Sequence, residues 1–379
     1  MTASSALIFQ DLTALVLLSR TPGIRKRGLD DFFGPHRSPT EILKRIQSGE
    51  HPVWKNSLET TLKKFDPEKE IKRTEDLGIV LLPFSDPRYP SLLKEISDPP
   101  LLLYVKGNFL ESDDAAVAIV GSRHAGLYGQ EQAKRFARRL TEWGLTIVSG
   151  FARGIDRASH EACLEISYGR TLAVLGSGLD VVYPKEHRAL YEEISERGAL
   201  ISEFALGTPP LAENFPKRNR IIAGLSLGVL VIEAHSRSGS LITAHLAAEE
   251  GREVFALPGR VDQLGSRGTH RLIKEGAALL ESPEEVLETL FPQLWPLVSA
   301  PASSSTASDQ ETEFLGVFDE FPLTSDEAAR LGGLSFSAAA SLLTGLELKG
   351  RLRKRRDGRY ERIQEARKGF ETQGKAKLY

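Results

Sequence analysis

The chain has 379 residues, enough for two or three domains, and its 41% hydrophobic and 26% charged residues are ordinary for a globular protein. Its net charge of -2 does not exclude nucleic-acid binding, because cations gathered on one surface can bind a polyanion whatever the total charge. The single cysteine, Cys163, excludes an intramolecular disulfide and a thiolate-rich metal site. No stretch has the pattern of a secretory signal or a membrane span. We therefore expect a cytoplasmic protein without a membrane segment.

Residues 1–78 predict a small N-terminal helical domain, similar to SAM or helix-hairpin-helix domains. Ala6–Ser19 is apolar at helical spacing, and the cation-rich turn Thr21–Gly28 follows it. In a helix-hairpin-helix such a turn presents backbone N–H groups to a phosphate, but an ordinary interhelical turn explains the residues equally well. Residues 79–107 change to short extended pieces, which indicate a connecting segment that packs on the next domain.

An alternation of strand and helix patterns from 115 to 290 dominates the predicted core domain, residues 79–296. The predicted strands are mostly continuous apolar runs, as buried parallel strands require: Ala116–Val120, Leu145–Ser149, Leu172–Leu175, Ala199–Ser202, Val229–Glu233 and Val254–Leu257. The helical runs Tyr128–Trp143, Ile155–Ile166 and Leu241–Glu250 separate some of them. This pattern predicts an α/β fold with a doubly wound, Rossmann-like parallel sheet, which binds ligands beyond the carboxyl ends of its strands.

Residues 297–312 are poor in large apolar side chains and predict a flexible linker. Beyond it, residues 313–379 predict three helices and a hairpin in the order of a winged-helix domain, with Ser335–Lys349 as its recognition helix. Residues 351–379 hold eleven Lys or Arg against four Asp or Glu, a composition typical of a polyanion-binding patch. A solvated basic tail has the same composition.

The stretch from Asn214 to Ser226 brings cations and an aromatic ring to the start of an apolar, helix-like run. Pro216 suits a first helical turn, so we expect the helix to begin near Lys217–Asn219, with free N–H groups that attract phosphate. Phe215, just outside this helix, offers a ring for base stacking, while Lys217, Arg218 and Arg220 supply positive charge. A hydrophobic staple with a solvated cationic face is the alternative interpretation.

The turn after the first core strand, which begins Gly121-Ser122-Arg123, has the form of an anion site. A Rossmann dinucleotide site needs a Gly-x-Gly-x-x-Gly turn and a later acidic residue, and neither is present, which disfavours NAD. A P-loop NTPase is excluded, because Leu127 and Tyr128 stand where Lys and Ser or Thr must be. Backbone N–H groups and Arg123 can still hold an anion. A tight strand-to-helix turn without a ligand also explains the glycine.

The predicted crevice holds few groups that could break bonds. Asp156 and His160 share a helix face and could form an acid/base pair, although a simple hydrogen bond on that face is the plainer use. The histidines show no metal-ligand spacing, so we expect no metal, and a Gly-x-Ser-x-Gly nucleophile elbow is absent. Glu203 and Glu233 follow strands but have no evident partner.

A series of motifs in the core resembles the DNA-processing protein A (DprA, also Smf) family of bacterial competence proteins. In chain order the motifs are Gly121-Ser-Arg123, Gly150-x-Ala-Arg-Gly-Ile-Asp156, Leu175-Gly-x-Gly-x-Asp180, Tyr183-Pro184, Ser202-Glu203, Phe215-Pro-Lys-Arg-Asn-Arg-Ile-Ile-Ala-Gly-Leu-Ser226, Glu233-Ala234, Ser238-Gly-Ser-Leu-x-Thr-Ala244 and Val254-Phe-Ala-x-Pro-Gly259. They cover about residues 79–290. A small helical domain before this core and a winged helix after it also occur in that family.

The resemblance implies a homodimeric, single-stranded DNA-binding protein that protects incoming strands and loads the recombinase RecA onto them during natural transformation. It implies no catalysis and no cofactor. Carried over residue by residue, it implies a phosphate pocket and a base-stacking ring, Phe215. The pocket residues are Gly121, Ser122, Arg123, Lys217, Arg218, Asn219, Gly239 and Ser240.

Two other functions stay open at the level of sequence. The same α/β architecture occurs in nucleotide phosphoribohydrolases of the lysine-decarboxylase-like group, and Ser238–Ala244 with Glu249 downstream stands at a similar place, although its glycine pattern differs. The second alternative is a duplex-binding repressor or adaptor that acts through residues 312–379.

Overall fold

The computed structural model describes residues 3–34, 37–292, 314–318, 321–348, 351–355 and 357–363. Contacts divide the chain into two compact units, Met1–Pro292 and Gln293–Ala376. Each unit has a buried core of its own. The predicted linker, residues 297–312, lies outside the described residues.

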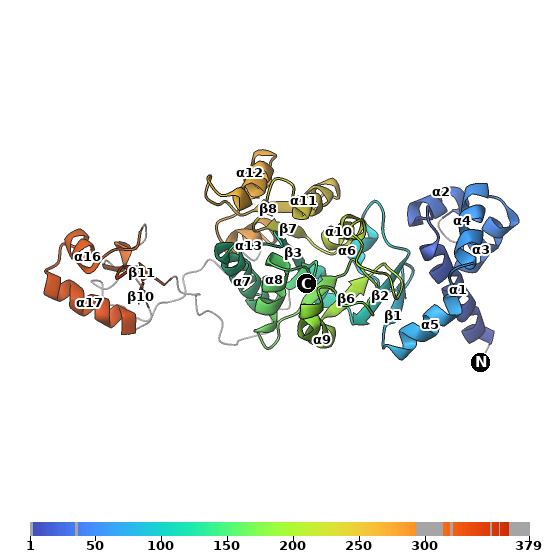
Figure 1. The fold of residues 1–379 in the computed structure, drawn as a ribbon, viewed down its shortest axis with the longest axis horizontal. Coiled ribbons are helices and arrows are strands. Elements are labelled where there is room, and N and C mark those ends of the chain that lie inside the picture. The colour runs from blue at the N-terminus through green and yellow to red at the C-terminus, as the bar shows by residue number, and fades with distance from the viewer. Residues whose placement is uncertain are drawn as a thin grey trace. The chain divides into compact units, whose positions relative to one another are not determined.

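Five helices precede the sheet, as the predicted N-terminal helical domain requires: α1 (Ala3–Arg20), α2 (Lys26–Phe33), α3 (Pro39–Ser48), α4 (Pro52–Leu62) and α5 (Pro67–Asp76). Three of them begin with a proline directly after a residue whose side chain accepts a backbone N–H, namely Ser38, His51 and Asp66. These signals explain why the segment breaks into short helices. The helices lie beside β1 and β2 (Figure 1), and their apolar side chains share one buried cluster with Leu102 and Tyr104. The boundary at residue 78 remains a prediction.

A sheet of nine strands forms the centre of this unit: β1 (Val80–Pro83), β2 (Leu102–Gly107), β3 (Ala116–Val120), β4 (Thr146–Ser149), β5 (Thr171–Val174), β6 (Ala199–Ser202), β7 (Gly228–Val231), β8 (Glu253–Ala256) and β9 (Ala278–Leu279). The helices between and after the strands are α6 (Ser91–Lys94), α7 (Leu127–Glu142), α8 (Ile155–Leu164), α9 (Arg188–Arg197), α10 (Asn214–Gly224), α11 (Gly239–Glu249), α12 (Arg267–Lys274) and α13 (Glu284–Leu290). Three short 3₁₀ helices complete it: η1 (Glu111–Ala115), η2 (Lys185–His187) and η3 (Leu264–Ser266). The six strands predicted from the sequence are all present, with ends that differ by at most two residues.

The strand order is β1-β2-β6-β5-β4-β3-β7-β8-β9. All neighbouring pairs from β6 to β9 in this order are parallel. The chain moves outward from β3 to β6 in one direction, then returns to β7 on the other side of β3 and moves outward to β9. The order of the strands therefore reverses between β3 and β7, which is where doubly wound sheets bind ligands.

Successive residues of β5, together with Leu175 directly after it, face opposite sides of the sheet. Leu172 and Val174 belong to one buried cluster, which includes residues of α10 and α11. Ala173 and Leu175 belong to the other, which includes residues of α8 and α9. Helices therefore cover both faces of the sheet, and this explains why its parallel strands are apolar throughout.

The lead-in segment differs from the prediction. We expected residues 79–107 to connect and pack against the core, but β1 and β2 extend the sheet itself as an antiparallel pair, with β2 antiparallel to β6. The sequence Leu102–Val105 is a continuous buried run, as a strand inside a sheet requires. The turn residues around it obscured this signal.

The second unit contains the predicted C-terminal elements. The described residues form α16 (Ser325–Leu331), α17 (Phe336–Leu348) and an antiparallel pair, β10 (Leu352–Lys354) and β11 (Tyr360–Arg362). Thr324 and Glu327 form a reciprocal capping box that begins α16. Phe314, Leu343 and Leu352 belong to the small core that joins these elements.

Among the helices in the described ranges, none is both long and apolar enough to cross a membrane.

Candidate nucleic-acid interface

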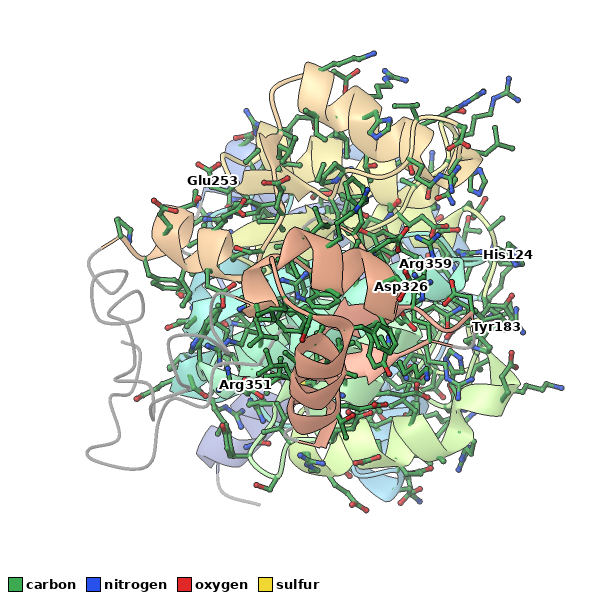
Figure 2. All side chains as sticks on the ribbon, turned by 90° about the vertical axis from the view of Figure 1, so that its left-hand side faces the viewer. His124, Tyr183, Glu253, Asp326, Arg351 and Arg359 are labelled. Carbon is green, nitrogen blue, oxygen red and sulfur yellow. The ribbon has the colours of Figure 1, made fainter. Side chains whose placement is uncertain are left out.

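A cleft of the first unit, with a volume of about 590 Å³, opens at the carboxyl ends of β3 and β7. The residues that directly follow these two strands form much of its wall. In Figure 2, His124 and Tyr183, which follow β3 and β5, lie on the right of the core, toward the carboxyl ends of the parallel strands. Glu253, at the start of β8, lies on the left, toward their amino ends. The cleft thus lies at the reversal point that the strand order defines.

Eight of the nine predicted site residues line this cleft: Gly121, Ser122, Arg123, Phe215, Arg218, Asn219, Gly239 and Ser240. They come from three separate segments, which follow β3, begin α10 and begin α11. Lys217 is the exception, because it lines a different cavity. The sequence predicted that Lys217 lies in the same pocket as the other eight residues, but the structure places it in another cavity.

The position of Lys217 follows from where α10 begins. We expected the helix to start near Lys217–Asn219, but it starts at Asn214, so Phe215 and Pro216 belong to its first turn. Pro216 permits this because a first-turn residue needs no N–H donor. In a helix, residues three, four and seven apart share a face, so Phe215, Arg218, Asn219 and Ile222 all reach the cleft. Lys217 lies about 200° around the helix from Phe215.

Gly121 and Ser122 hold the end of β3 tightly against its neighbours. The N–H of Ser122 donates to the carbonyl of Glu233 over 2.7 Å, and the Ser122 hydroxyl accepts from the N–H of His124 over 3.2 Å. A Cβ atom at Gly121 would lie 2.5 Å from the Ile155 Cγ1 atom, so only glycine fits. This packing directs the following side chain, Arg123, into the cleft.

Arg123 and Phe215 contact each other across the cleft. The guanidinium carbon of Arg123 lies 4.7 Å from the centroid of the Phe215 ring, a cation–π contact. A Cβ atom at Gly176 would lie 3.0 Å from the same ring, so this glycine lets the ring approach the backbone. The side chain of Arg123 is exposed and that of Phe215 is half-buried. The cleft therefore presents an exposed cation directly over an aromatic ring.

Arg218 lines the cleft but is only 3% exposed. Its Nη1 group donates to the carbonyl of Gly150 over 2.8 Å and also to that of Val174, so it joins the ends of β4 and β5. Burial lowers the pKa of Arg218 to about 10, and the nearby carboxylate of Asp156 opposes this shift. Burial likewise raises the pKa of Asp156, whereas Arg218 lowers it. Arg218 thus supplies charge from the floor of the cleft while it holds two strand ends.

The third segment joins α10 to the start of α11. The side-chain amide of Asn219 donates to the carbonyl of Gly239 over 3.2 Å. Ser238 caps α11, since its hydroxyl accepts from the N–H of Ser240 and lies 2.7 Å from the Ser240 hydroxyl. The first turn of α11 contains no acidic residue, so its positive end borders the cleft without a carboxylate of its own.

The pattern of residues agrees with what known proteins show. The family model of DNA recombination-mediator protein A matches residues 80–291, more than half of the chain. The chain belongs to the DprA/Smf family. Protein Smf of Escherichia coli K12 is 44% identical over 277 residues, which cover 71% of this chain and 74% of that relative. DNA processing protein DprA of Streptococcus pneumoniae R6 is 48% identical over 202 residues, which cover 53% of this chain and 71% of that relative.

Solved structures of DprA proteins share the fold. The X-ray structure of DprA from Streptococcus pneumoniae aligns with a TM-score of 0.62 at 37% identity, over 76% of this chain and 98% of that one. A structure of DprA from Helicobacter pylori, described for its single-stranded DNA binding mode, aligns with a TM-score of 0.50 at 30% identity. That alignment covers 56% of this chain and 96% of the Helicobacter chain. Membership of the DprA/Smf family supports a DNA-processing role.

The DprA/Smf cleft also contains Arg237 and His235, which the sequence alone did not single out, and Tyr183, which was named only as part of a family motif. Arg237 and His235 are exposed and follow β7, and Tyr183 is 38% exposed. A signal for Arg237 was present, because it directly precedes the Ser238-Gly-Ser240 turn that we did select. Asp156 is the only carboxylate residue in the described lining, so exposed positive charge from Arg123 and Arg237 dominates the cleft.

The groups considered for catalysis in this DprA/Smf chain have other partners. Asp156 accepts from the N–H of Ala152, whereas His160 bonds to Thr171 over 2.7 Å, so the two do not form an acid/base pair. Glu203 forms an ion pair with Arg220 over 2.7 Å, and Arg220 does not line the cleft. Glu233 accepts from the N–H of Gly126. The relatives from Streptococcus pneumoniae and Bacillus subtilis are named for DNA processing and not for an enzymatic activity. Within the described residues no cluster of three or more His, Cys, Asp or Glu could hold a metal ion.

Proposed function

We propose that this protein binds single-stranded DNA in the cleft between the ends of β3 and β7. The proposal rests chiefly on the Arg123–Phe215 contact, in which an exposed cation lies over an aromatic ring at the mouth of a cleft with positive surroundings. A phosphate can pair with Arg123, and a base can stack on the ring once the guanidinium moves to that phosphate. Neither contact distinguishes one base from another, so binding is tolerant of sequence.

The cleft, which has the rings of Phe215 and Tyr183 in its lining, suits one strand with splayed bases. In a duplex the bases are stacked on each other and their faces are not accessible to Phe215. The DprA structure from Helicobacter pylori, which is described for its single-stranded DNA binding mode, supports binding of a single strand. The phosphate contacts of Gly121, Ser122, Arg218, Asn219, Gly239 and Ser240 belong to this proposal. Arg218 contributes through charge and strand positioning, because its side chain is buried.

Fluorescence anisotropy with labelled oligo-dT and with the matching duplex, across a salt series, tests the proposal. Wild-type protein should prefer the single strand. Arg123→Ala should weaken binding by roughly fivefold at 0.1 M salt and reduce the slope of log K against log salt by about 0.7, the share of one phosphate contact in a single strand. Phe215→Ala should weaken binding with little change of slope, since stacking releases no counterion.

The matched control is Arg188→Ala, because this arginine is 70% exposed on α9 and does not line the cleft. It should leave both affinity and slope unchanged. Equal binding of single strand and duplex, together with no effect of Arg123→Ala, would contradict the proposal.

RecA loading and a homodimer are finer parts of the proposal, supported by the family resemblance alone. We propose that the protein presents the bound strand to RecA and acts as a dimer. Sedimentation of the purified protein over a concentration range tests the dimer. RecA ATPase activity on strands coated with single-strand-binding protein tests the loading. This protein should stimulate that activity, and an absence of stimulation contradicts only the loading part of the proposal.

We propose that residues 313–379, most of which belong to the second unit, form a winged helix. The order α16, α17, β10, β11 and the shared core support it. Its expected recognition helix is a poor fit for DNA, however, because the described residues of α17 carry no Lys or Arg. The described cations of this unit include Arg330 on α16 and, on the hairpin, Arg353 and Arg355, which both pair with Glu361. This charge distribution favours single-strand binding by the core over duplex recognition by α17.

A further inference from the structure

A second cavity, with a volume of about 190 Å³, lies beside α10 and the turn between α1 and α2. All of its residues belong to the first unit. Four cations line it: Arg20, Arg25 and Lys26 from the turn, and Lys217 from α10. The turn is the one whose residues resembled a phosphate-binding hairpin, and Lys217 is the predicted phosphate ligand that does not reach the cleft.

The carboxylates of this cavity are already neutralised. Asp98 accepts from Arg25 over 2.9 Å and from Arg220 over 3.2 Å, and Glu203 accepts from Arg220 over 2.7 Å. Arg220 is almost buried, with 11% of its side chain exposed, so it remains with these two carboxylates. Lys26 pairs with Asp30 on its own helix. The positive charge of Arg20 and Lys217 therefore stays in excess.

The partners of Lys217 and Arg20 are weak. Lys217 pairs with Glu213 over 3.4 Å, and these side chains are 51% and 68% exposed. Such exposed ion pairs contribute about 0–1 kcal/mol. Arg20 makes a 3.5 Å contact with the hydroxyl of Thr208. A phosphate can replace both partners at little cost, since charge-assisted bonds to phosphate are stronger.

The cavity also receives the positive end of a helix. α2 begins at Lys26 without a side-chain cap and without an acidic residue in its first turn. In contrast, α3, α4 and α5 are capped by side chains. The free N–H groups of α2 add to the attraction of Arg20 and Lys217 for an anion.

The cavity and the cleft meet at the first turn of α10. Pro216 lines the cleft and the next residue, Lys217, lines the cavity. Lys217 lies about 200° around the helix from Phe215, so a strand that leaves Phe215 reaches Lys217 by passing around the first turn of α10. Because both sites border this turn and carry the same sign of charge, one polyanion can occupy both.

We propose that the cavity lined by Arg20, Arg25, Lys26 and Lys217 is a second contact for the phosphodiester backbone of the strand that occupies the cleft. This inference rests on the proposed single-strand function and adds the N-terminal helices to its binding surface. Short strands fill the cleft alone, and longer strands also contact the α1–α2 turn.

The test compares oligo-dT of about 6 nucleotides with oligo-dT of about 24 nucleotides on the full chain, by anisotropy at several salt concentrations. The double variant Arg20→Ala with Lys217→Ala, which removes the two cations in excess, should weaken binding of the long strand on the order of tenfold. It should also reduce the salt slope for the long strand by about 1.4, as expected for two lost contacts. Binding of the short strand should not change.

The control variant is Arg27→Ala, which removes a neighbouring arginine of α2 that is 75% exposed and does not line the cavity. It should affect neither strand. Equal affinity of the double variant and wild type for the long strand overturns the inference and leaves the proposed function intact. Failure of wild-type protein to bind the short strand overturns the proposed function as well.

A measurement without substitutions gives an independent result. Hydrogen exchange of wild-type protein should show protection of residues 20–28 by the long strand and not by the short one. Protection that is absent with the long strand, at concentrations that saturate binding, overturns the inference even where the variants fail to fold.

Discussion

Gly121 determines how closely the end of β3 approaches α8. A Cβ atom there would lie 2.5 Å from Ile155 Cγ1 and 2.9 Å from the carbonyl oxygen of Glu233. The Ile155 side chain is fully buried and cannot move away without disturbing the core. The residue that looked like a phosphate-binding glycine is therefore also required for packing.

We predict that Gly121→Ala lowers the free energy of unfolding by about 1–3 kcal/mol, the usual cost of forcing an extra methyl into a packed core. Urea denaturation measures it. Gly239→Ala is the matched control, because a Cβ atom at Gly239 meets nothing within 4 Å. A stability of Gly121→Ala equal to that of wild type would show that Ile155 and the β3 end can separate freely.

His160 and His187 are buried polar side chains on either side of Phe151. Phe151 lies 6.3 Å from the ring of His160 and 5.2 Å from that of His187. Burial lowers the pKa of His160 to about 3 and also lowers the pKa of His187. Both rings are therefore neutral in the folded protein at physiological pH.

This burial predicts that the protein loses stability in mild acid. The unfolded chain binds a proton at His160 below pH 6.5 while the folded protein does not, so the stability present above pH 6.5 is lost as the pH falls toward 3. Between pH 6.5 and 5.5, wild type should lose about 1 kcal/mol more than His160→Gln in urea denaturation. His245→Gln, at an exposed position, should follow wild type. Parallel pH profiles of wild type and His160→Gln would contradict the prediction.

At the scale of elements, a buried carboxylate holds the N-terminal helices to the core. Glu70 of α5 is 3% exposed, and its Oε1 atom accepts from the N–H of Leu206 over 2.7 Å. Burial raises the pKa of Glu70, and the bond to Leu206 lowers it. Arg73 of the same helix pairs with Asp180 over 2.9 Å. These contacts hold α5 against the loops that follow β5 and β6.

We predict that Glu70→Ala lowers the free energy of unfolding by about 1–3 kcal/mol, because it leaves the buried N–H of Leu206 without an acceptor. Thermal and urea denaturation measure the loss. Glu70→Gln keeps an acceptor oxygen at the same place and should retain most of the stability. If Glu70→Ala and Glu70→Gln lose the same amount, the N–H of Leu206 has another acceptor.

At the scale of the whole molecule, the two compact units suggest a division of labour. The cleft and the second cavity both lie in the unit Met1–Pro292. The basic tail, residues 351–379, follows this unit in the sequence and adds positive charge.

We predict that a chain ending at Pro292 keeps its preference for single strands over duplex, with affinity within about tenfold of the full chain, since it loses only unspecific electrostatic attraction. Anisotropy with oligo-dT and duplex measures both. Complete loss of binding on truncation would instead support a duplex-binding adaptor that acts through its C-terminal unit.

The sequence by itself predicted the α/β class, the six parallel strands and the cleft at their carboxyl ends. These features follow from local patterns, because apolar runs, helical periodicity and turn residues are each confined to a few neighbouring positions. The motifs around Gly121, Phe215 and Ser238 also identified eight residues that line the cleft.

Only the tertiary structure decided which way these residues face and what they contact. The start of α10 at Asn214 turned Lys217 away from the cleft and placed it opposite the α1–α2 turn. Arg218 proved to be buried on the carbonyls of Gly150 and Val174. Each of these outcomes depends on contacts between segments far apart in the chain, and a local pattern carries no information about such partners.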